Sequence, residues 1–148
     1  MTSSKPVNRA LAVSTRVKIA LAVRSDLEVW QKLNVAAFLP SGFGTADPSL
    51  TGDAYADGDG CSYPPMLAHP VRVFTGDSSA LRRSFQRALD RGLLVSVYTD
   101  DMFSTMNDDD NRAAVAAVKT PDLVLAGFAV AGDARQVDKA FDKLALHT

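Results

Sequence analysis

Residues 98–112, YTDDMFSTMNDDDNR, combine several side-chain types that hold small ligands. They follow an apolar run that reads as a strand, and the ends of strands in α/β folds commonly form ligand crevices. Asp100 supplies hydrogen-bond acceptors, while Thr105 and Asn111 supply both donors and acceptors. We therefore predict that this segment forms one wall of a binding site. The alternative is an acidic turn that caps a helix, which explains Asp108–Asp110 better than it explains Asp100 and Thr105.

A second candidate wall lies in residues 24–34, RSDLEVWQKLN. Trp30, Asn34 and Phe38 are spaced four residues apart, so they share one side of a helix. A buried Asn needs hydrogen-bond partners, whereas an Asn at a cleft presents its amide to a ligand. Two interpretations follow, a ligand-facing stripe and an ordinary helix surface.

Motifs for cofactors and metals are missing from the sequence. The turn after the apolar run 17–23 contains no glycine, so it fits neither of the common nucleotide-binding fingerprints. The Asp/Gly-rich stretch that includes Asp57 lacks the closing carboxylate of a calcium loop. One Cys and two His residues support neither a zinc cluster nor a Cys–His nucleophile. We predict no metal site and no cofactor.

Composition narrows the class of protein. The 148 residues fit one domain. Lys and Arg number 16 against 17 for Asp and Glu, and this neutral balance argues against RNA binding. Cys61 is the only cysteine, which excludes an internal disulfide and suits a cytoplasmic location. The N-terminal residues do not read as a signal peptide, and no window approaches the roughly 18 apolar residues of a membrane helix.

Strands and helices alternate along the predicted chain, which indicates a layered α/β fold around one sheet. Residues 1–15 are expected to be a flexible lead-in to a single domain, 16–148. Four strands are predicted, at residues 17–23, 69–76, 93–99 and 122–132. Helices are predicted at 25–39 and 77–92, from about residue 108 to Pro121, and from Asp133 through Leu144.

Local signals set the expected ends of these elements. Ser25 and Glu28 form an S-x-x-E capping box for the first helix, and Pro40 ends it. Residues 41–66 are rich in Gly, Asp, Ser and Pro, and they predict a long loop.

Four segments of the chain resemble a family of small bacterial proteins known only as a domain of unknown function. The segments are VKIALAVRSDLEVWQKLNVAAFL, GDAYADGDG, YTDDMFSTMNDDDNRAAV and GFAVAGDARQVDKAFDKLALH, and the resemblance covers residues 16–148. That family is similar in fold to the archaeal and eukaryotic (second) type of peptidyl-tRNA hydrolase. The resemblance implies a three-layer α/β/α sandwich with a four-stranded mixed sheet, and a homodimer.

The same resemblance assigns roles to particular residues. Arg24 and Asp26 match the hydrolase motif R-x-D-L, Lys32 approximates the lysine of its helix, and Asp100 stands at its aspartate, with Thr105 near its threonine. Lys32 and Asp100 are then the catalytic candidates. The substrate-binding candidates are Arg24, Asp26, Trp30, Asn34, Thr105 and Asn111. The turn DDMFST lacks the glycine of the hydrolase motif, and the long loop has no hydrolase equivalent.

Two hypotheses for function result. In the first, the protein is an ester hydrolase acting on an RNA-linked or small acyl substrate, with Lys32 orienting the phosphate or carbonyl and Asp100 orienting the attacking water. In the second, it is a non-catalytic module that binds a small molecule or a protein segment. Tyr55 and Tyr63 of the long loop would then supply apolar walls.

Overall fold

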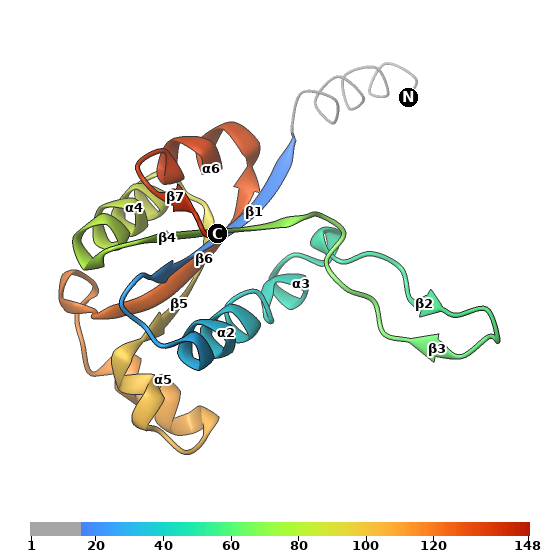
Figure 1. Ribbon diagram of the computed structural model, residues 1–148, viewed down its shortest axis with the longest axis horizontal. Coiled ribbons are helices and arrows are strands. Elements are labelled where there is room, and N and C mark those ends of the chain that lie inside the picture. Colours follow the sequence, from blue (N-terminus) through green and yellow to red (C-terminus); the bar gives the residue numbers. More distant parts are fainter. Residues whose placement is uncertain (1–15) are drawn as a thin grey trace, which may run out of the picture.

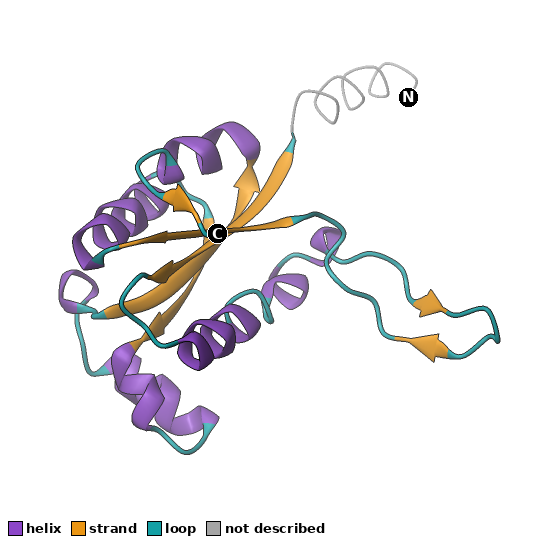
Figure 2. Cartoon of the chain, viewed as in Figure 1, coloured by secondary structure: helices purple, strands orange, loops and turns teal. Residues whose placement is uncertain are grey.

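The computed structural model describes residues 16–148, which form helices on both faces of one mixed sheet (Figures 1 and 2). The lead-in expected at residues 1–15 lies outside the described residues. The strands are β1 (Val17–Arg24), β4 (Val71–Gly76), β5 (Leu94–Thr99), β6 (Leu125–Asp133) and β7 (Ala145–Leu146), in the order β5-β6-β1-β4-β7. The four expected strands are present. The expected count of four is corrected to five, because the two-residue β7 is too short to show a sequence pattern.

The two central strands carry the core. β1 pairs in parallel with β4 and antiparallel with β6, and β6 pairs antiparallel with β5. Side chains alternate along β1, so Ile19, Leu21 and Val23 face one hydrophobic core while Ala20 and Ala22 face the other. Both faces are therefore covered, which explains the continuous apolar sequence of this strand.

Helices α4 (Ser78–Asp90) and α6 (Ala134–Phe141) cover one face of the sheet (Figure 1). The Asp77 side chain caps α4 by accepting from the Ala80 N–H at 2.8 Å, and Asp133 caps α6 through the Gln136 N–H at 3.2 Å. Gly92 takes a φ of 68° just after α4, a conformation that favours glycine. The expected starts of both helices and the expected end of α4 are confirmed. Helix α6 ends at Phe141, so Leu144, which was expected on its buried face, lies beyond the helix.

Helix α2 (Val29–Phe38) lies on the other face. The expected cap at Ser25 is wrong, because the helix begins later and Glu28 is its N-cap. The Gln31 side chain accepts a hydrogen bond from the Glu28 N–H at 2.9 Å, and this contact stabilises the first turn. Val35 is the one fully buried residue of α2, so the helix rests on the sheet along a narrow line.

The expected long loop is replaced by ordered structure. It contains the short helix α3 (Phe43–Ala46), the turn η1 (Pro48–Leu50), and the strands β2 (Tyr55–Ala56) and β3 (Ser62–Tyr63). We call residues 51–68 the arm, since they project from the domain as a two-stranded hairpin (Figure 1).

The remaining elements lie after β5 and before β6. They are η2 (Asp100–Ser104), α5 (Asp108–Ala116) and η3 (Thr120–Asp122). Asn107 caps α5 by accepting from the Asp110 N–H at 2.9 Å. Within residues 16–148, every helix is too short or too polar to cross a membrane.

Gly127 allows α2 to approach the sheet. A Cβ at this position would lie 2.6 Å from the Ala22 carbonyl oxygen and 2.8 Å from a Val35 methyl group. We expect Gly127→Ala to lower the free energy of unfolding by about 1–3 kcal/mol, the usual cost of overpacking a core. Urea denaturation measures this. Gly42→Ala is the control, because a Cβ there meets no atom within 4 Å, and equal stability of the two variants would contradict the prediction.

Candidate functional site

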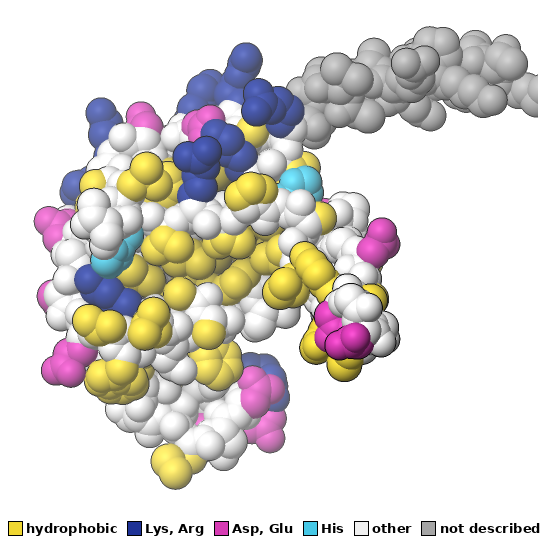
Figure 3. All heavy atoms as spheres, turned by 45° about the vertical axis from the view of Figure 1, so that its right-hand side comes forward, with side chains coloured by type: hydrophobic (Ala, Val, Ile, Leu, Met, Phe, Trp, Pro, Cys, Tyr) yellow, Lys and Arg dark blue, Asp and Glu magenta, His cyan; other side chains and the backbone are white. Residues whose placement is uncertain are grey.

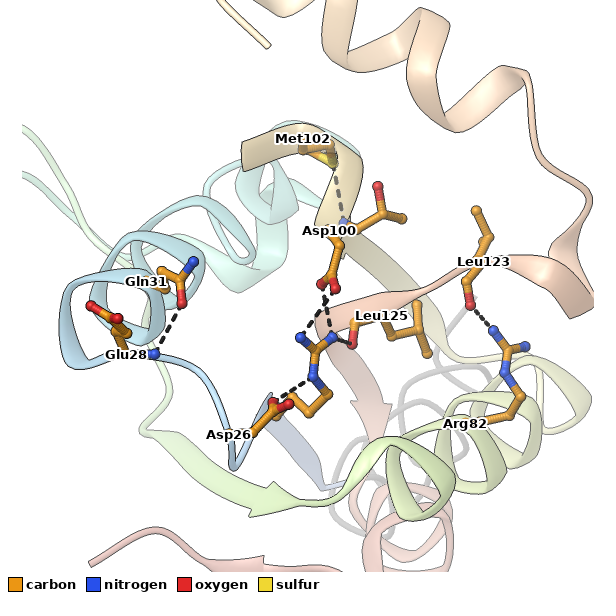
Figure 4. Close-up of polar contacts among 10 residues, drawn as sticks. Asp26, Glu28, Gln31, Arg82, Asp100, Met102, Leu123 and Leu125 are labelled. Carbon is orange, nitrogen blue, oxygen red and sulfur yellow. Dashed lines mark hydrogen bonds and ion pairs between the residues drawn. The ribbon is translucent and has the colours of Figure 1, made fainter. Parts of the chain in front are cut away.

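Arg24, the last residue of β1, joins three parts of the chain, and Figure 4 labels its partners Asp26, Asp100 and Leu125. Its Nη1 and Nη2 donate to the two carboxylate oxygens of Asp100 at 2.8 and 3.1 Å. Its Nε donates to Asp26 at 2.6 Å, and Nη1 also donates to the Leu125 carbonyl oxygen at 2.7 Å. Arg24 thus ties the end of β1 to the end of β5 and the beginning of β6. We call Arg24, Asp26 and Asp100 the arginine cluster.

The arginine cluster is partly shielded from water. The Arg24 side chain is 11% exposed and that of Asp100 is 39% exposed. The hydrogen bonds from Arg24 to Asp100 raise the pKa of the guanidinium above its ordinary value, so Arg24 is charged at every accessible pH. Because both oxygens of Asp100 already accept from Arg24, the carboxylate is held in one orientation.

Lys32 lies elsewhere. Its Nζ is 3.2 Å from Nε2 of His147, which follows β7. β7 and β5 are opposite edges of the sheet, and Asp100 follows β5. The resemblance to the hydrolases implies one site that contains Arg24, Asp26, Lys32 and Asp100. The structure brings Arg24, Asp26 and Asp100 together, whereas Lys32 contacts His147.

A cleft lies between α2, η2 and α5, beside the edge strand β5. One pocket of about 540 Å³ and a second of about 350 Å³ share five lining residues, so they adjoin, and we call the two together the cleft. The shared residues are Phe38, Tyr98, Met102, Asp108 and Asn111. Four predicted binding residues line the smaller pocket, namely Trp30, Asn34, Thr105 and Asn111. The arginine cluster and Lys32 line neither pocket.

Aromatic side chains form the inner wall of the cleft. Trp30 meets Phe103 edge to face, with ring centroids 5.9 Å apart, and Phe103 lies 5.1 Å from the ring of Tyr98. Sequence reasoning identified Trp30 but missed Tyr98, Phe103 and Met102. Phe103 and Met102 lie in the short turn η2, where no helical or strand spacing marks them.

Two polar pairs interrupt this apolar wall. The Asn34 side-chain amide donates to the Tyr98 hydroxyl at 3.1 Å, and the Thr105 hydroxyl is hydrogen-bonded to the Asn111 side chain. At the mouth, Arg112 forms ion pairs with Asp108 and Asp109 on its own helix. The cleft therefore offers neutral hydrogen-bonding groups, while its charged groups already have partners. No cluster of His, Cys, Asp and Glu suited to a metal ion occurs within residues 16–148.

Helices on both faces of a five-stranded mixed sheet, with a cleft beside one edge strand, define a small α/β domain. Residues 17–148 match the family described as "Protein of unknown function (DUF2000)", and the chain belongs to this family. This confirms the resemblance to a domain of unknown function.

One solved structure, of a protein of unknown function from Agrobacterium tumefaciens strain C58, is similar to this chain. The sequences are 39% identical, the match covers 89% of this chain and 98% of the other, and the TM-score is 0.84. A search of curated proteins finds no match. The resemblance to peptidyl-tRNA hydrolases stays a prediction.

We predict that the bond between Arg24 and Asp100 stabilises the fold. Arg24→Met removes the guanidinium, and we expect a loss of about 1.5–3 kcal/mol in the free energy of unfolding, the range for hydrogen bonds to charged groups. A double-mutant cycle with Asp100→Asn isolates the pair.

The exposed pair of Lys18 and Asp138, 2.8 Å apart, is the matched control for this cycle. Its coupling energy should stay below about 1 kcal/mol. A coupling for Arg24 and Asp100 no larger than that of the control pair would show that the arginine cluster does not hold the strands together.

Proposed function

We propose that this protein is a non-catalytic module that binds a small molecule in the cleft between α2 and α5. The observation that carries the proposal is the pair of adjoining pockets, about 540 and 350 Å³, which share Phe38 and Tyr98 in their walls. Ligand pockets in proteins have volumes of this size and are largely apolar with a few placed polar groups. The free cysteine, Cys61, fits a cytoplasmic location, which we also infer.

The lining indicates the class of ligand. Phe38, Met102 and Val115 favour an apolar or aromatic body. The Tyr98 hydroxyl and the Asn111 amide favour one neutral polar group on that body. Because Arg112 already pairs with two carboxylates, the cleft gives little attraction to a charged ligand. A neutral, largely apolar molecule fits best.

Trp30 supplies a direct test, because it is the only tryptophan and it lines the smaller pocket. We expect N-phenyl-1-naphthylamine, a neutral aromatic probe, to quench the fluorescence of Trp30 saturably, with one probe per cleft. Ala116→Phe should weaken this binding about tenfold or more, since the exposed Ala116 lines the larger pocket and a phenyl ring would fill it.

The control is Ala113→Phe, at an exposed position of the same helix that lines neither pocket. Its affinity for the probe should equal that of the unmodified protein. Quenching that does not saturate, or an equal loss in both variants, would refute the proposed site.

Ester hydrolysis is the second candidate function, and one observation favours it. Arg24 bonds both Asp26 and Asp100, which the resemblance to the second type of peptidyl-tRNA hydrolase also places in one site. We rank it second, because both oxygens of Asp100 already accept from Arg24 and because Lys32 contacts His147 and not Asp100. A general base needs an oxygen within reach of the water that it activates.

A hydrolase would release the acylated amino acid from an N-acyl-aminoacyl-tRNA. On the binding-module proposal we expect no turnover by the purified protein. Turnover that is lost in both Lys32→Ala and Asp100→Ala, but kept in Asp90→Ala, would establish the hydrolase and overturn our ranking. Asp90 is a suitable control because it bonds only Gln86 on its own helix among the described side chains. Circular dichroism confirms that each variant is folded.

A further inference from the structure

An apolar surface away from the cleft has no partner within the described chain. On α2, Val29 is 73% exposed and Leu33 is 66% exposed, and on the arm Met66 is 62% exposed. Tyr55 and Tyr63 of the arm are also about half exposed. We call Val29, Leu33, Tyr55, Tyr63 and Met66 the apolar band. Figure 3 shows hydrophobic side chains across one face of the molecule and on the arm. Exposed apolar side chains that lie together are typical of interaction sites.

A groove runs beside the apolar band. It has a volume of about 710 Å³ and lies between the end of α2, the helix α3 and the base of the arm. Ala37, Tyr55, Met66 and Val71 are among its lining residues. Ala37 continues the line of Val29 and Leu33 along α2 at intervals of four residues. The band and the groove therefore form one surface.

The adjoining edge of the sheet is also open. β7 pairs with β4 only at Phe74 and Thr75, and the His147 N–H donates to the Val73 carbonyl at 2.9 Å. The backbone N–H and C=O groups of successive residues point to opposite sides of a strand, so those of Val71 point to the same edge as those of Val73. The pairing with β7 does not extend as far as Val71. An uncovered edge is a ready site for another chain.

Hydrogen bonds to the Asp57 side chain stabilise the turn of the arm. Asp57 accepts hydrogen bonds from the Asp59 and Cys61 backbone N–H groups at 3.0 Å each and from the Tyr63 hydroxyl at 2.7 Å. These bonds, that of Tyr63 first, hold the pKa of Asp57 below its ordinary value. An isolated two-stranded hairpin is only marginally stable in water. Because these bonds hold the turn in one conformation, the projecting arm presents a defined surface to a partner.

Charge indicates which partner fits. The arm carries Asp53, Asp57 and Asp59, and residues 41–68 contain no Lys or Arg. Figure 3 shows acidic side chains on the arm and a group of Lys and Arg side chains above the hydrophobic band. Arg72 on β4 is exposed and forms no ion pair within residues 16–148. Further exposed cations lie on α6 and the turn that follows it, at Arg135, Lys139 and Lys143. The molecule thus carries an acidic arm and a basic surface that complement each other.

We propose that two copies of this chain form a twofold dimer in which the arm of each copy lies across the apolar band of the other, with its carboxylates facing Arg72 of that copy. A twofold interface places the same patch of both copies in contact, so it requires a surface that complements itself. The apolar band together with the opposite charges of the arm and of Arg72 meets this requirement. The dimer leaves the proposed ligand cleft on a different side of α2.

The dimer is tested by sedimentation velocity over a range of protein concentrations. We expect twice the chain mass, with Leu33→Glu and Met66→Glu raising the dissociation constant about tenfold or more, because an unpaired carboxylate would be buried in the interface. Both residues are exposed in the single chain, so neither change affects its core. Met106→Glu makes the same change at a residue that is 91% exposed and outside the apolar band, and it should leave the dimer intact.

Charge reversal tests the predicted pairing. Arg72→Glu alone, and Asp53→Lys with Asp59→Lys, should each weaken the dimer, and the triple variant should regain it. Cys61, the only cysteine, accepts a photo-crosslinker on the arm of the full chain. Crosslinks should join two copies and reach the α2 or β4 segment. A monomer at all concentrations, crosslinks within one copy, or a dimer unaffected by Leu33→Glu and Met66→Glu would overturn the proposal.

Discussion

The arginine cluster is the contact on which the rest of the structure depends. β1 and β6 fill the middle of the sheet, and their buried side chains are apolar. Apolar side chains make no directional contacts with one another. The Arg24 side chain, at the end of β1, makes directional hydrogen bonds to the segments that follow β5 and begin β6. Its guanidinium needs compensating partners when partly buried, and Asp26, Asp100 and the Leu125 carbonyl provide them.

This arginine cluster also positions the cleft, although it does not line it. Asp100 is the first residue of η2, and its backbone N–H donates to the Val124 carbonyl at 3.0 Å. η2 carries Met102 and Phe103, which form the wall opposite α2. Fixing Asp100 therefore fixes the aromatic wall. The same bonds orient both oxygens of Asp100 toward Arg24, so the structural role that they indicate for Asp100 needs no catalytic function.

The sequence predicted the elements whose signals are local and repeated. The strands at β1, β4, β5 and β6 and the caps at Asp77 and Asp133 were found from apolar runs and capping residues. β7 has only two residues, and the arm consists of two short strands stabilised by Asp57, so neither has a periodic pattern. For the cleft, spacing on one helix identified Trp30 and Asn34. The partners Tyr98 and Phe103 come from other elements, and only tertiary packing brings them there.

Helix α2 shows why one apolar pattern was difficult to interpret. Val35 and Leu39 are buried on the sheet, Trp30, Asn34 and Phe38 line the cleft, and Val29, Leu33 and Ala37 lie outward along the apolar band and groove. In a helix that packs only on its own sheet, the outward residues would be polar. The apolar residues on three sides are explained if α2 serves three surfaces at once. The sheet-facing side is buried within the chain, and on the cleft side Trp30 and Asn34 already contact Phe103 and Tyr98. The outward side, with Val29 and Leu33, is the exposed one, and the second copy that we propose would cover it.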